Sequence, residues 1–487
     1  MGRVFVGVWL VMVVSATAWV ASVFAGSSDL DRRENMALVA NYPGERLPGG
    51  GFERYRTGTD MAFWGDLAVL GNLDQGTGPN AEPNGGFRLM DISEPARPRL
   101  ITRWKCPGDQ SDVSIWKDLV ILSADKPTKE RCGAAEPASW EGIRVVSIKD
   151  PADPRIVATV PTRCGSHTNT TIRDGGRLLV YVLSYPLAGR YNPADKMVPR
   201  AAGGPGCNAV DHGVISVVEV PLSNPSAARV VSTPSVAPTI GCHDVTVFEG
   251  RELAAAACLT ETQIWDLSGD PARPEVIAHI ENPPGLNLSH STAFSNDGRT
   301  LVVGDELGGA AASPGCVTDD KRYVSGGLFF FDVAGARSRA PRLVGNYKLP
   351  QAQASLFCTA HQFNVVPLRS DRDVLVSSWY TGATSVLDFT NPADPRQIAW
   401  YVPRNPTTPD RQESHAATWA SYWYRGHVYS SNFDEEVNSL VPYSRGLDVF
   451  RVDHAAVRGA LDLPRLNPQV QEPLPQPPGR KRKARGR

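Results

Sequence analysis

The sequence has almost no net charge and no long segment of helical periodicity. Lys and Arg together number 50 and Asp and Glu 51, which leaves a formal charge of −1. Such a balance lacks the basic field typical of nucleic-acid binders, so we expect no specific nucleic-acid partner. The 44 Gly and 40 Pro residues divide the apolar segments into short pieces. That pattern is typical of many short strands joined by turns, and it predicts an all-β protein.

Several motifs of catalytic and metal sites are also missing. No C-x-x-C pair is present, which excludes zinc ribbons and thioredoxin-like centres. Neither H-E-x-x-H, a nucleophile elbow, a Walker loop nor a dinucleotide fingerprint stands out. Since no D-x-D-x-D-G loop occurs, the acidic loops give only a weak calcium signal. The linear sequence therefore predicts no catalytic residue.

An apolar run follows Arg3 at the N-terminus and predicts export. It extends from Val4 to Ala25, and small side chains precede a cleavage point at Gly26. The run is long for a signal peptide and near the length of a membrane span, so both a signal peptide and an uncleaved anchor are open for residues 1–25. No cysteine lies near Gly26, which argues against a lipid anchor. Residues 26–36 are expected to be a short linker.

All eight cysteines lie beyond this segment. An even number in an exported chain predicts four disulfides. The cysteines are Cys106, Cys132, Cys164, Cys207, Cys242, Cys258, Cys316 and Cys358. We therefore expect a secreted or extracytoplasmic protein, either released or held to the membrane by its N-terminal segment.

One phrase recurs seven times along the chain: a strand ending in Asp or another polar residue, an Asx/Pro turn, and a second strand. The copies begin at Leu89, Val146, Val217, Trp265, Phe331, Leu387 and Phe450. Each copy follows an apolar strand, and these strands begin at Leu67, Leu119, Leu178, Leu253, Thr300, Val374 and His427. Another short strand precedes each of those, so every unit supplies four strands, A to D. Four-stranded units repeated around an axis predict a seven-bladed β-propeller over residues 37–463.

The two ends of the repeat region predict how the ring closes. ALVANYP at Ala37 resembles LVGNYKLP at Leu343, the expected outermost strand of the fifth unit. The last unit, after Phe450, lacks a good copy of that strand. We therefore expect the N-terminal strand to complete the seventh blade and to protect its open edge.

The repeated phrases resemble those of the LVIVD-repeat family of bacterial and archaeal surface or secreted proteins. The resemblance extends from about Ala37 to Val457. It implies a β-propeller fold and an extracytoplasmic location. It implies no particular activity, because the family has no uniform one.

Aligned starts of the innermost strands suggest a ring of ionisable residues. The segments read GTDMAFW, QSDVSIW, GSHTNTTI, CHDVTVF, SHSTAFS, AHQFNVV and SHAATWA. Each contributes one member of the expected ring: Asp60, Asp112, His167, His243, His290, His361 and His415. Because strand A lines the central channel, these side chains are expected to meet at one of its openings.

Three interpretations of this ring are open. The side chains can hydrogen-bond to channel water and backbone, bind a transition metal (zinc, copper, iron or nickel), or transfer protons without a metal. Asp244 follows His243 and is expected either to orient an imidazole or to be a surface carboxylate.

The cysteines fall into two classes that share one face of a propeller. One class precedes the ring residues and the other follows the ends of B strands. Within blades, this arrangement favours the pairs Cys106–Cys132, Cys164–Cys207 and Cys242–Cys258, and leaves Cys316–Cys358 between blades. The sequence alone does not determine the connectivity. Bracing of the long loops is a role that by itself would explain these disulfides.

Long B–C loops on the same face predict a binding surface. Its candidate anchors are Trp140, Tyr185, Tyr323 and Tyr443. Our leading interpretation is a monomeric binding module that holds a protein, a glycan or a cell-wall component. A metal-dependent enzyme at the ring is the alternative. Residues 464–487 are Pro-rich and end in RKRKARGR, which predicts a disordered tail with weak attraction to anionic wall polymer or membrane.

Overall fold

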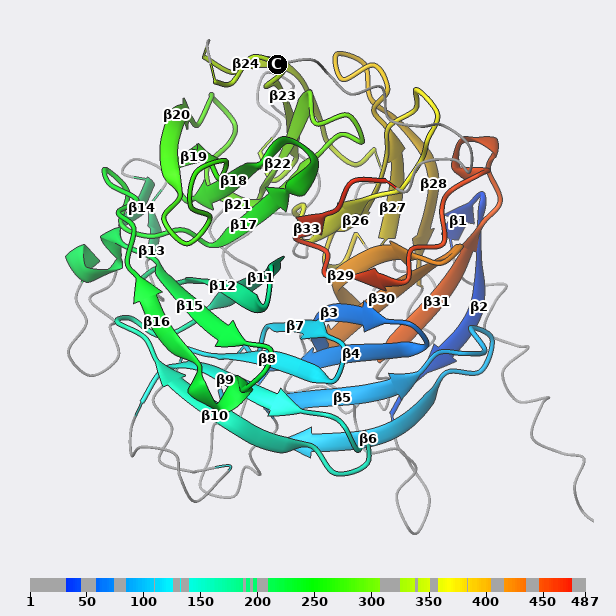
Figure 1. Cartoon of the computed structure of the whole chain (residues 1–487). Helices are drawn as coiled ribbons and strands as arrows, with labels where there is room; N and C mark the ends of the chain where they lie inside the picture. The colour runs from blue at the N-terminus through cyan, green and yellow to red at the C-terminus, as the bar shows by residue number, and fades with distance from the viewer. Residues whose placement is uncertain are drawn as a thin grey trace, which may run out of the picture.

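Seven sheets, each built on four antiparallel strands, are arranged around a central axis in the computed structural model, which confirms the predicted β-propeller (Figure 1). The structure describes residues 32–44, 58–73, 85–108, 110–125, 132, 140–186, 190–192, 196–198, 209–306, 325–337, 340–350, 358–382, 384–403, 416–434 and 446–474. The predicted signal or anchor segment lies outside these residues. No helix in the described part of the chain is long and apolar enough to cross a membrane.

Within each blade the strands A to D follow one another from the axis outward. Blade 1 consists of β3 (Gly58–Trp64), β4 (Leu67–Asn72), β5 (Gly86–Asp91) and β6 (Arg99–Lys105). Blade 2 consists of β7 (Val113–Trp116), β8 (Leu119–Ala124), β9 (Gly142–Ser147) and β10 (Arg155–Pro161). Blade 3 consists of β11 (Thr168–Asp174), β12 (Arg177–Leu183), β15 (Ser216–Pro221) and β16 (Arg229–Ser232). Blades 4 and 5 consist of β17 (Asp244–Phe248), β18 (Leu253–Cys258), β19 (Glu261–Asp266) and β20 (Glu275–Glu281); β21 (Ser289–Phe294), β22 (Thr300–Asp305), β23 (Leu328–Asp332) and β24 (Arg342–Tyr347). Blade 6 consists of β25 (Phe363–Val365), β26 (Val374–Ser378), β27 (Thr384–Asp388) and β28 (Arg396–Val402); blade 7 of β29 (Ala416–Tyr424), β30 (His427–Asp434), β31 (Leu447–Val452) and β2 (Met36–Tyr42).

The repeated Asp and the following turn form the C–D connections. The Oδ1 atoms of Asp91, Asp266 and Asp388 each accept a hydrogen bond from the backbone N–H two residues later, at 2.9–3.0 Å. This Asx turn fixes the reversal of the chain at the end of strand C. The repeat phrase seen in the sequence is thus the C–D hairpin of each blade.

Apolar side chains on the two faces of each blade pack against its two neighbours. Met61 lies in a cluster with Tyr422 of blade 7, whereas Ala62, the next residue, lies in a cluster with Val113 of blade 2. Alternation along a strand sends successive side chains to opposite faces, so each blade needs apolar residues on both. One such cluster fills each of the seven interfaces between adjacent blades in the described residues.

The N-terminal strand β2 completes the seventh blade, as predicted. It pairs antiparallel with β31, and Met36 lies opposite Val452 while Tyr42 lies opposite Leu447. Gly446 has φ +56°, and a Cβ there would lie 2.1 Å from the carbonyl oxygen of Tyr42. Gly86 of blade 1 stands in the same relation to the outer strand of its own blade. The seventh blade is therefore built like the others although its outer strand comes from the far end of the chain.

The predicted linker at residues 26–36 needs a correction. Strand β1 (Arg32–Glu34) pairs antiparallel with β28 and adds a fifth strand to the outer edge of blade 6. The first described residues are thus already part of the propeller. The chain passes from the outer edge of blade 6 to that of blade 7 before it enters blade 1.

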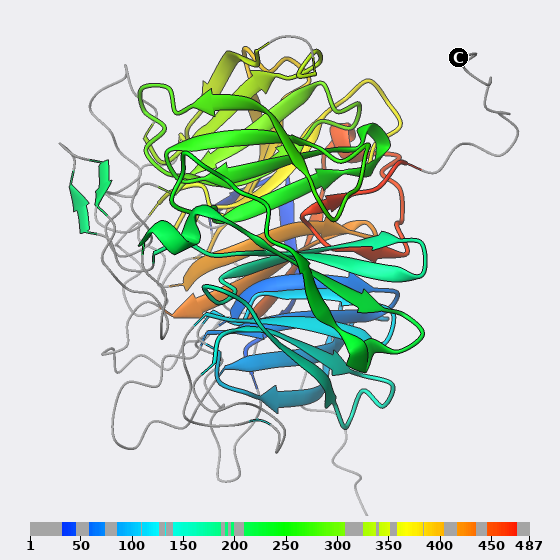
Figure 2. The same cartoon turned by 60° about the vertical axis from the view of Figure 1, so that its left-hand side comes forward.

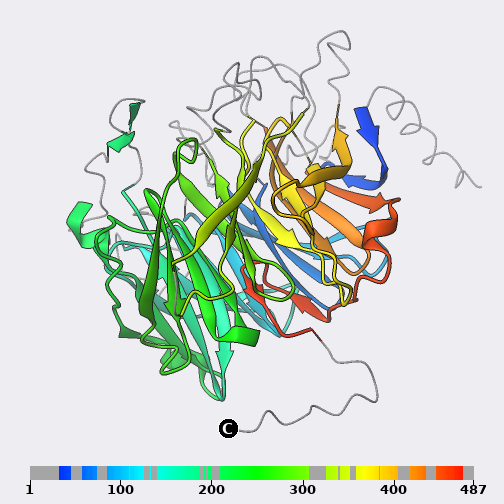
Figure 3. The ribbon, with the colours of Figure 1, turned by 90° about the horizontal axis from the view of Figure 1, so that it is seen from above.

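The predicted start of the disordered tail, at residue 464, is also too early. Strand β32 (Arg465–Leu466) pairs with the end of β3, and β33 (Val470–Gln471) pairs in parallel with the end of β17. Residues 464–474, here called the C-terminal strap, therefore lie at the centre of the propeller, on the face where the A strands end (Figures 1 and 3). Residues 475–487, with the basic cluster, lie outside the described residues.

Amide side chains of the strap replace the missing neighbour of the innermost strands. Asn467 accepts a hydrogen bond from the backbone N–H of Ile115 and donates one to its carbonyl oxygen, at 2.8 and 3.0 Å. Gln471 makes the same pair of bonds with Phe294, at 2.7 and 2.6 Å. A primary amide carries the donor and the acceptor of a peptide group, so it satisfies an open strand edge as another strand would.

The opposite face, where the A strands begin, is called the upper face below. The hairpin of β13 (Arg190–Asn192) and β14 (Lys196–Val198), inserted between strands B and C of blade 3, projects from it (Figure 2). Helical structure in the described residues consists of short 3-10 turns: η1 (Ala209–Gly213), η2 (Pro225–Ala227), η3 (Glu249–Arg251) and η5 (Ala455–Val457).

Candidate metal centre at the upper end of the channel

Four of the predicted ring histidines meet at the upper end of the channel. The ring centroids are 4.8 Å apart for His167–His243, 3.6 Å for His243–His290 and 4.5 Å for His290–His361. All four residues are at most 5% exposed. They form a continuous row across blades 3 to 6, here called the histidine arc. His415 lies outside the described residues.

Asp60 and Asp112 do not share the position of the histidines, which corrects the predicted ring. The carbonyl of Asp112 accepts a hydrogen bond from Ser123, as the carbonyl of Gln362, the residue after His361, accepts one from Ser378. Strand pairing places Met61, Val113 and Val245 at equivalent positions of their blades. Asp60 and Asp112 therefore correspond to Asp244, one residue beyond His243. Since successive strand residues point in different directions, this single-residue difference separates two groups of side chains.

His290, Glu306 and His361 are placed to hold a metal ion. One ligand atom of each lies within 4.8 Å of those of the other two. Nε2 of His290 is 3.4 Å from one carboxylate oxygen of Glu306, and Nε2 of His361 is 3.7 Å from the other. His290 belongs to the innermost strand of blade 5, Glu306 directly follows strand B of the same blade, and His361 comes from blade 6. Two imidazoles and one carboxylate are a common ligand set for Zn²⁺ and non-haem Fe²⁺.

Hydrogen bonds fix both imidazoles in the tautomer that a metal requires. Nδ1 of His361 donates to the carbonyl oxygen of Trp419 at 2.5 Å. The hydroxyl of Ser291 donates its one proton to the carbonyl of His361, so at 3.2 Å it can only accept from Nδ1 of His290. Both Nε2 atoms therefore present lone pairs toward the Glu306 carboxylate. Three electron-rich groups converge on one point, an arrangement that a cation between them stabilises.

The surroundings keep these ligands neutral and oriented. Burial lowers the pKa of His361 to about 3, and it lowers the pKa of His290 well below the ordinary value. The imidazoles are therefore unprotonated at neutral pH, as metal binding requires. The hydroxyl of Tyr380 donates a hydrogen bond to Glu306 and holds the carboxylate in place. Such contacts behind the ligands tune and orient metal sites.

The other half of the arc has a different set of neighbours. Nδ1 of His167 is 2.6 Å from Oδ2 of Asp125, which follows strand B of blade 2. Nε2 of His167 is 3.1 Å from Nε2 of His243 and 3.4 Å from the hydroxyl of Tyr185. Burial first, and then the neighbouring imidazoles, lower the pKa of His243 well below its ordinary value.

Asp60, Asp112 and Asp244 form a separate acidic group between the arc and the C-terminal strap. Asp60 accepts hydrogen bonds from the Tyr422 hydroxyl and, at 2.9 Å, from Gln469 of the strap. Asp112 accepts from the backbone and side-chain amides of Asn169. Burial raises the pKa of each of the three carboxyls, and that of Asp244 reaches about 8. Asp244 is 1% exposed and contacts Gln362, so it is neither a surface carboxylate nor an orienter of an imidazole.

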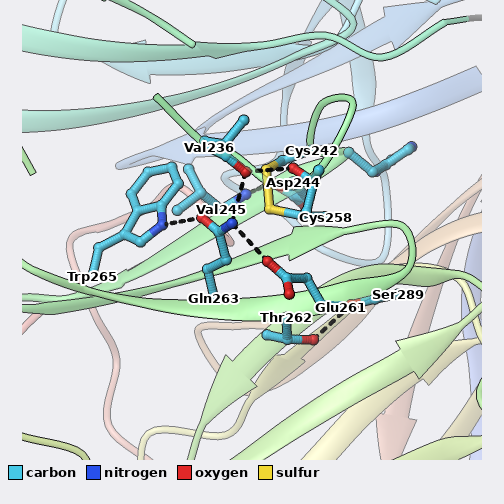
Figure 4. Close-up of a disulfide and its surroundings, with 12 residues drawn as sticks. Val236, Cys242, Asp244, Val245, Cys258, Glu261, Thr262, Gln263, Trp265 and Ser289 are labelled. Carbon is cyan, nitrogen blue, oxygen red and sulfur yellow. Dashed lines mark hydrogen bonds between the residues drawn. A yellow bond between two sulfur atoms is a disulfide. The ribbon is translucent and has the colours of Figure 1, made fainter. Parts of the chain in front are cut away.

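Disulfides anchor the segments that carry the histidines. The predicted pairs Cys106–Cys132 and Cys242–Cys258 are confirmed. Cys164 and Cys358 are also disulfide-bonded, but their predicted partners Cys207 and Cys316 lie outside the described residues. Cys242 directly precedes His243, and its partner ends strand B of the same blade. Figure 4 shows this disulfide beside Gln263, whose amide nitrogen donates to Val236 and Glu261, both at 2.8 Å.

Of the four predicted binding-face anchors, the structure describes Trp140 and Tyr185. Trp140 is only 7% exposed, and the guanidinium of Arg144 lies 4.8 Å from its ring centroid. Trp140 is therefore a buried residue and not an exposed anchor. Tyr185 packs edge-on against His167, with the ring centroids 4.8 Å apart. Tyr323 and Tyr443 lie outside the described residues.

The acidic residues of this site were not among those predicted from the sequence. Glu306 and Asp125 both follow the apolar B strand of their blade, in the segments TLVVGDE and LVILSAD. A carboxylate at the end of a B strand, on the face where the histidines lie, was the available signal. The supporting groups Tyr380 and Trp419 gave none, because their partners are 74 and 58 residues away along the chain.

Comparisons with known proteins support the fold alone. No family model matches the chain, and no curated protein matches it. A solved protein from Lactobacillus plantarum has a TM-score of 0.52 and 11% identity, over 84% of this chain and 97% of that one. A periplasmic gluconolactonase of Pseudomonas aeruginosa has a TM-score of 0.50 and 11% identity, over 79% and 98%.

Proposed function

We propose that the protein is a metal-dependent enzyme whose metal is held by His290, Glu306 and His361. The observation that carries the proposal is the convergence of two Nε2 lone pairs and one carboxylate within 4.8 Å. Both Nδ1 protons are already donated, to Ser291 and to the Trp419 carbonyl. Three protein ligands leave coordination positions for water or a substrate, as catalytic sites require. A bound metal would supply Lewis-acid or redox chemistry there.

The chain's own residues provide the rest of the site. Tyr380 holds the Glu306 carboxylate, and the Trp419 carbonyl holds His361. Buried aromatic rings beside His361 exclude water from one side: the centroids of Tyr380 and Trp419 are 4.6 and 4.8 Å from it. Because the strap occupies the opposite face, we infer that a substrate enters from the upper face.

Metal analysis tests the proposal. The protein would be purified without chelators or an affinity histidine tag, and its zinc, copper, iron and nickel content measured before and after titration with each ion. We expect near-stoichiometric binding that is lost in His290→Ala, Glu306→Gln and His361→Ala. His427→Ala, a histidine on the lower face, serves as the matched control. A folded wild-type protein that takes up none of the four metals would overturn the proposal.

A binding module is the second candidate function. We also propose that the protein lies outside the cytoplasm and that it is a member of the LVIVD-repeat family. The disulfides support the location, since such bonds persist in oxidising compartments. The upper face supports the binding role, because the β13–β14 hairpin projects from it and Tyr185 lies beside the arc. Deletion of residues 190–198 would abolish capture of a cell-wall or protein ligand if this face binds it. If the deletion variant captures the ligand as well as the wild type does, the hairpin is not part of the binding surface.

A further inference from the structure

The histidine arc contains a second cluster of metal-binding atoms outside the His290–Glu306–His361 set. Nε2 of His167 and Nε2 of His243 face each other at 3.1 Å, and the hydroxyl of Tyr185 is 3.4 Å from the first of them. His167 and His243 are both buried, with whole-residue exposures of 5% and 1%. They belong to blades 3 and 4, whereas the first set belongs to blades 5 and 6.

Hydrogen bonding leaves this pair incompletely satisfied. The Asp125 carboxylate is an acceptor, so Nδ1 of His167 carries the proton and Nε2 presents a lone pair. Nδ1 of His243 is buried and makes no well-aligned hydrogen bond among the described residues, and a looser contact with the backbone of His290 favours a proton on this ring. If that nitrogen carries the proton, two lone pairs face each other. If Nε2 of His243 carries the proton instead, the lone pair on the buried Nδ1 atom has no donor. Neither tautomer of His243 gives the ring a full set of partners, and such groups are rare in folded proteins.

The distances suit ligands of one ion. With metal–nitrogen bonds of about 2.0–2.1 Å, neighbouring ligand atoms lie roughly 2.9–3.4 Å apart in octahedral or tetrahedral geometry. The observed 3.1 and 3.4 Å fall within that range. The Asp125–His167 contact also reproduces the carboxylate–histidine pair found behind metal ligands, which fixes the ring and increases its basicity.

We propose that His167, His243 and Tyr185 form a second site for a first-row transition-metal ion, adjacent to the first. This inference rests on the proposed function, because the two sites share the arc: the rings of His243 and His290 are in contact, with centroids 3.6 Å apart. The enzyme thus has a two-metal centre. Imidazole and phenolate ligands favour Cu²⁺ or Fe³⁺, and binding as phenolate releases the Tyr185 proton to solvent.

Zinc and copper stoichiometry test the second site. After equilibrium dialysis against Zn²⁺, elemental analysis is expected to give two equivalents for the wild type and for His279→Ala, a control histidine outside the arc. His167→Ala and His243→Ala are each expected to retain one equivalent, and so is His290→Ala. If folded His167→Ala still binds two equivalents of Zn²⁺, the second site is overturned. It is also overturned if the wild type binds a single equivalent and His290→Ala loses it. Either result leaves the proposed function standing. Absence of metal in the wild type would overturn both.

Copper spectroscopy keeps the test decisive if an alanine variant fails to fold. We expect wild-type protein with two equivalents of Cu²⁺ to show a tyrosinate charge-transfer band and magnetic coupling between the ions. Tyr185→Phe is expected to lose the band but keep the coupling. A wild-type spectrum of isolated ions without the band, unchanged in Tyr185→Phe, would overturn the second site.

Discussion

The side-chain amide of Gln469 donates a hydrogen bond of 2.9 Å to Asp60, which lies 409 residues earlier in the chain. This contact joins the C-terminal strap to the innermost strand of blade 1. The same strap contacts blades 2, 4 and 5 through Asn467, Val470 and Gln471. A segment that the sequence assigned to a disordered tail therefore ties four blades together across the lower end of the channel.

Truncation after Leu463 is expected to destabilise the propeller. It removes the hydrogen bonds between the strap amides and the strand backbones, and it exposes the Asp60 carboxyl. Each net hydrogen bond contributes about 1 kcal/mol, and the truncated chain no longer has to order the strap. We therefore expect the free energy of unfolding to fall by roughly 2–4 kcal/mol. Denaturant unfolding would measure it. Truncation after Leu474 removes only the basic tail and should leave the midpoint unchanged. Equal midpoints for both truncations would contradict a bracing role.

Tyr380→Phe is expected to weaken metal binding at the proposed site about 10- to 100-fold, because the Glu306 carboxylate loses the hydroxyl that holds it. Calorimetric titration with Zn²⁺ would measure the change. Tyr347→Phe is the matched control, since that tyrosine lies on the outer strand β24 of blade 5, away from the innermost strands that carry the arc. An affinity equal to that of the control would show that Tyr380 does not position the ligand.

The contribution of Asp244 to stability is expected to fall as pH rises from about 4 to 8. Burial raises the pKa of this carboxyl from 3.8 to about 8, so the folded state keeps a proton that the unfolded chain has already lost. The group's contribution is present in full below the unfolded pKa and is lost as pH rises through the folded pKa. Asp244→Asn should remove this contribution, so the unfolding midpoint of the variant should rise relative to that of the wild type as pH increases in this window. An equal slope in the variant would refute the assignment.

Removal of the Cys242–Cys258 disulfide by a double Ala substitution is expected to cost about 3 kcal/mol, since the bridge closes a loop of sequence separation 16. It should also weaken metal binding, because Cys242 directly precedes His243 in the arc. The Cys106→Ala/Cys132→Ala variant tests specificity: neither of its cysteines adjoins a histidine of the arc in the sequence, so it should weaken metal binding less. If both variants bind metal equally well, the bridge serves stability alone.

Met36→Ala is expected to destabilise the closure of the ring by about 2–3 kcal/mol, since Met36 is 3% exposed and packs with blades 6 and 7. Leu343→Ala, on the equivalent outer strand of blade 5, changes a side chain that is 38% exposed and should cost less than about 1 kcal/mol. Thermal unfolding distinguishes the two. Similar losses would mean that the closing strand is no more constrained than an ordinary outer strand.

The amino-acid sequence by itself determined the number of blades, the strands within them and the closing of the ring. These features are local or repeated: an Asp with its Asx turn, an apolar B strand, and ALVANYP matching another outer strand. Two disulfide pairs followed for the same reason, because the propeller order places D–A and B–C connections on one face. The histidines were also visible, since strand A starts recur at a fixed place in each repeat.

Only the tertiary structure decided which side chains meet. The alignment of the strand starts was displaced by one residue in blades 1 and 2, and it therefore grouped Asp60 and Asp112 with the histidines. The strand pairing places these two residues at the position of Asp244 instead. Glu306 and Asp125 join the arc because B strands end beside neighbouring A strands, a contact between segments with no shared sequence signal. The strap was read as disordered because its Asn and Gln side chains have no apolar pattern. Their partners are the open edges of innermost strands, which exist only once the ring is closed.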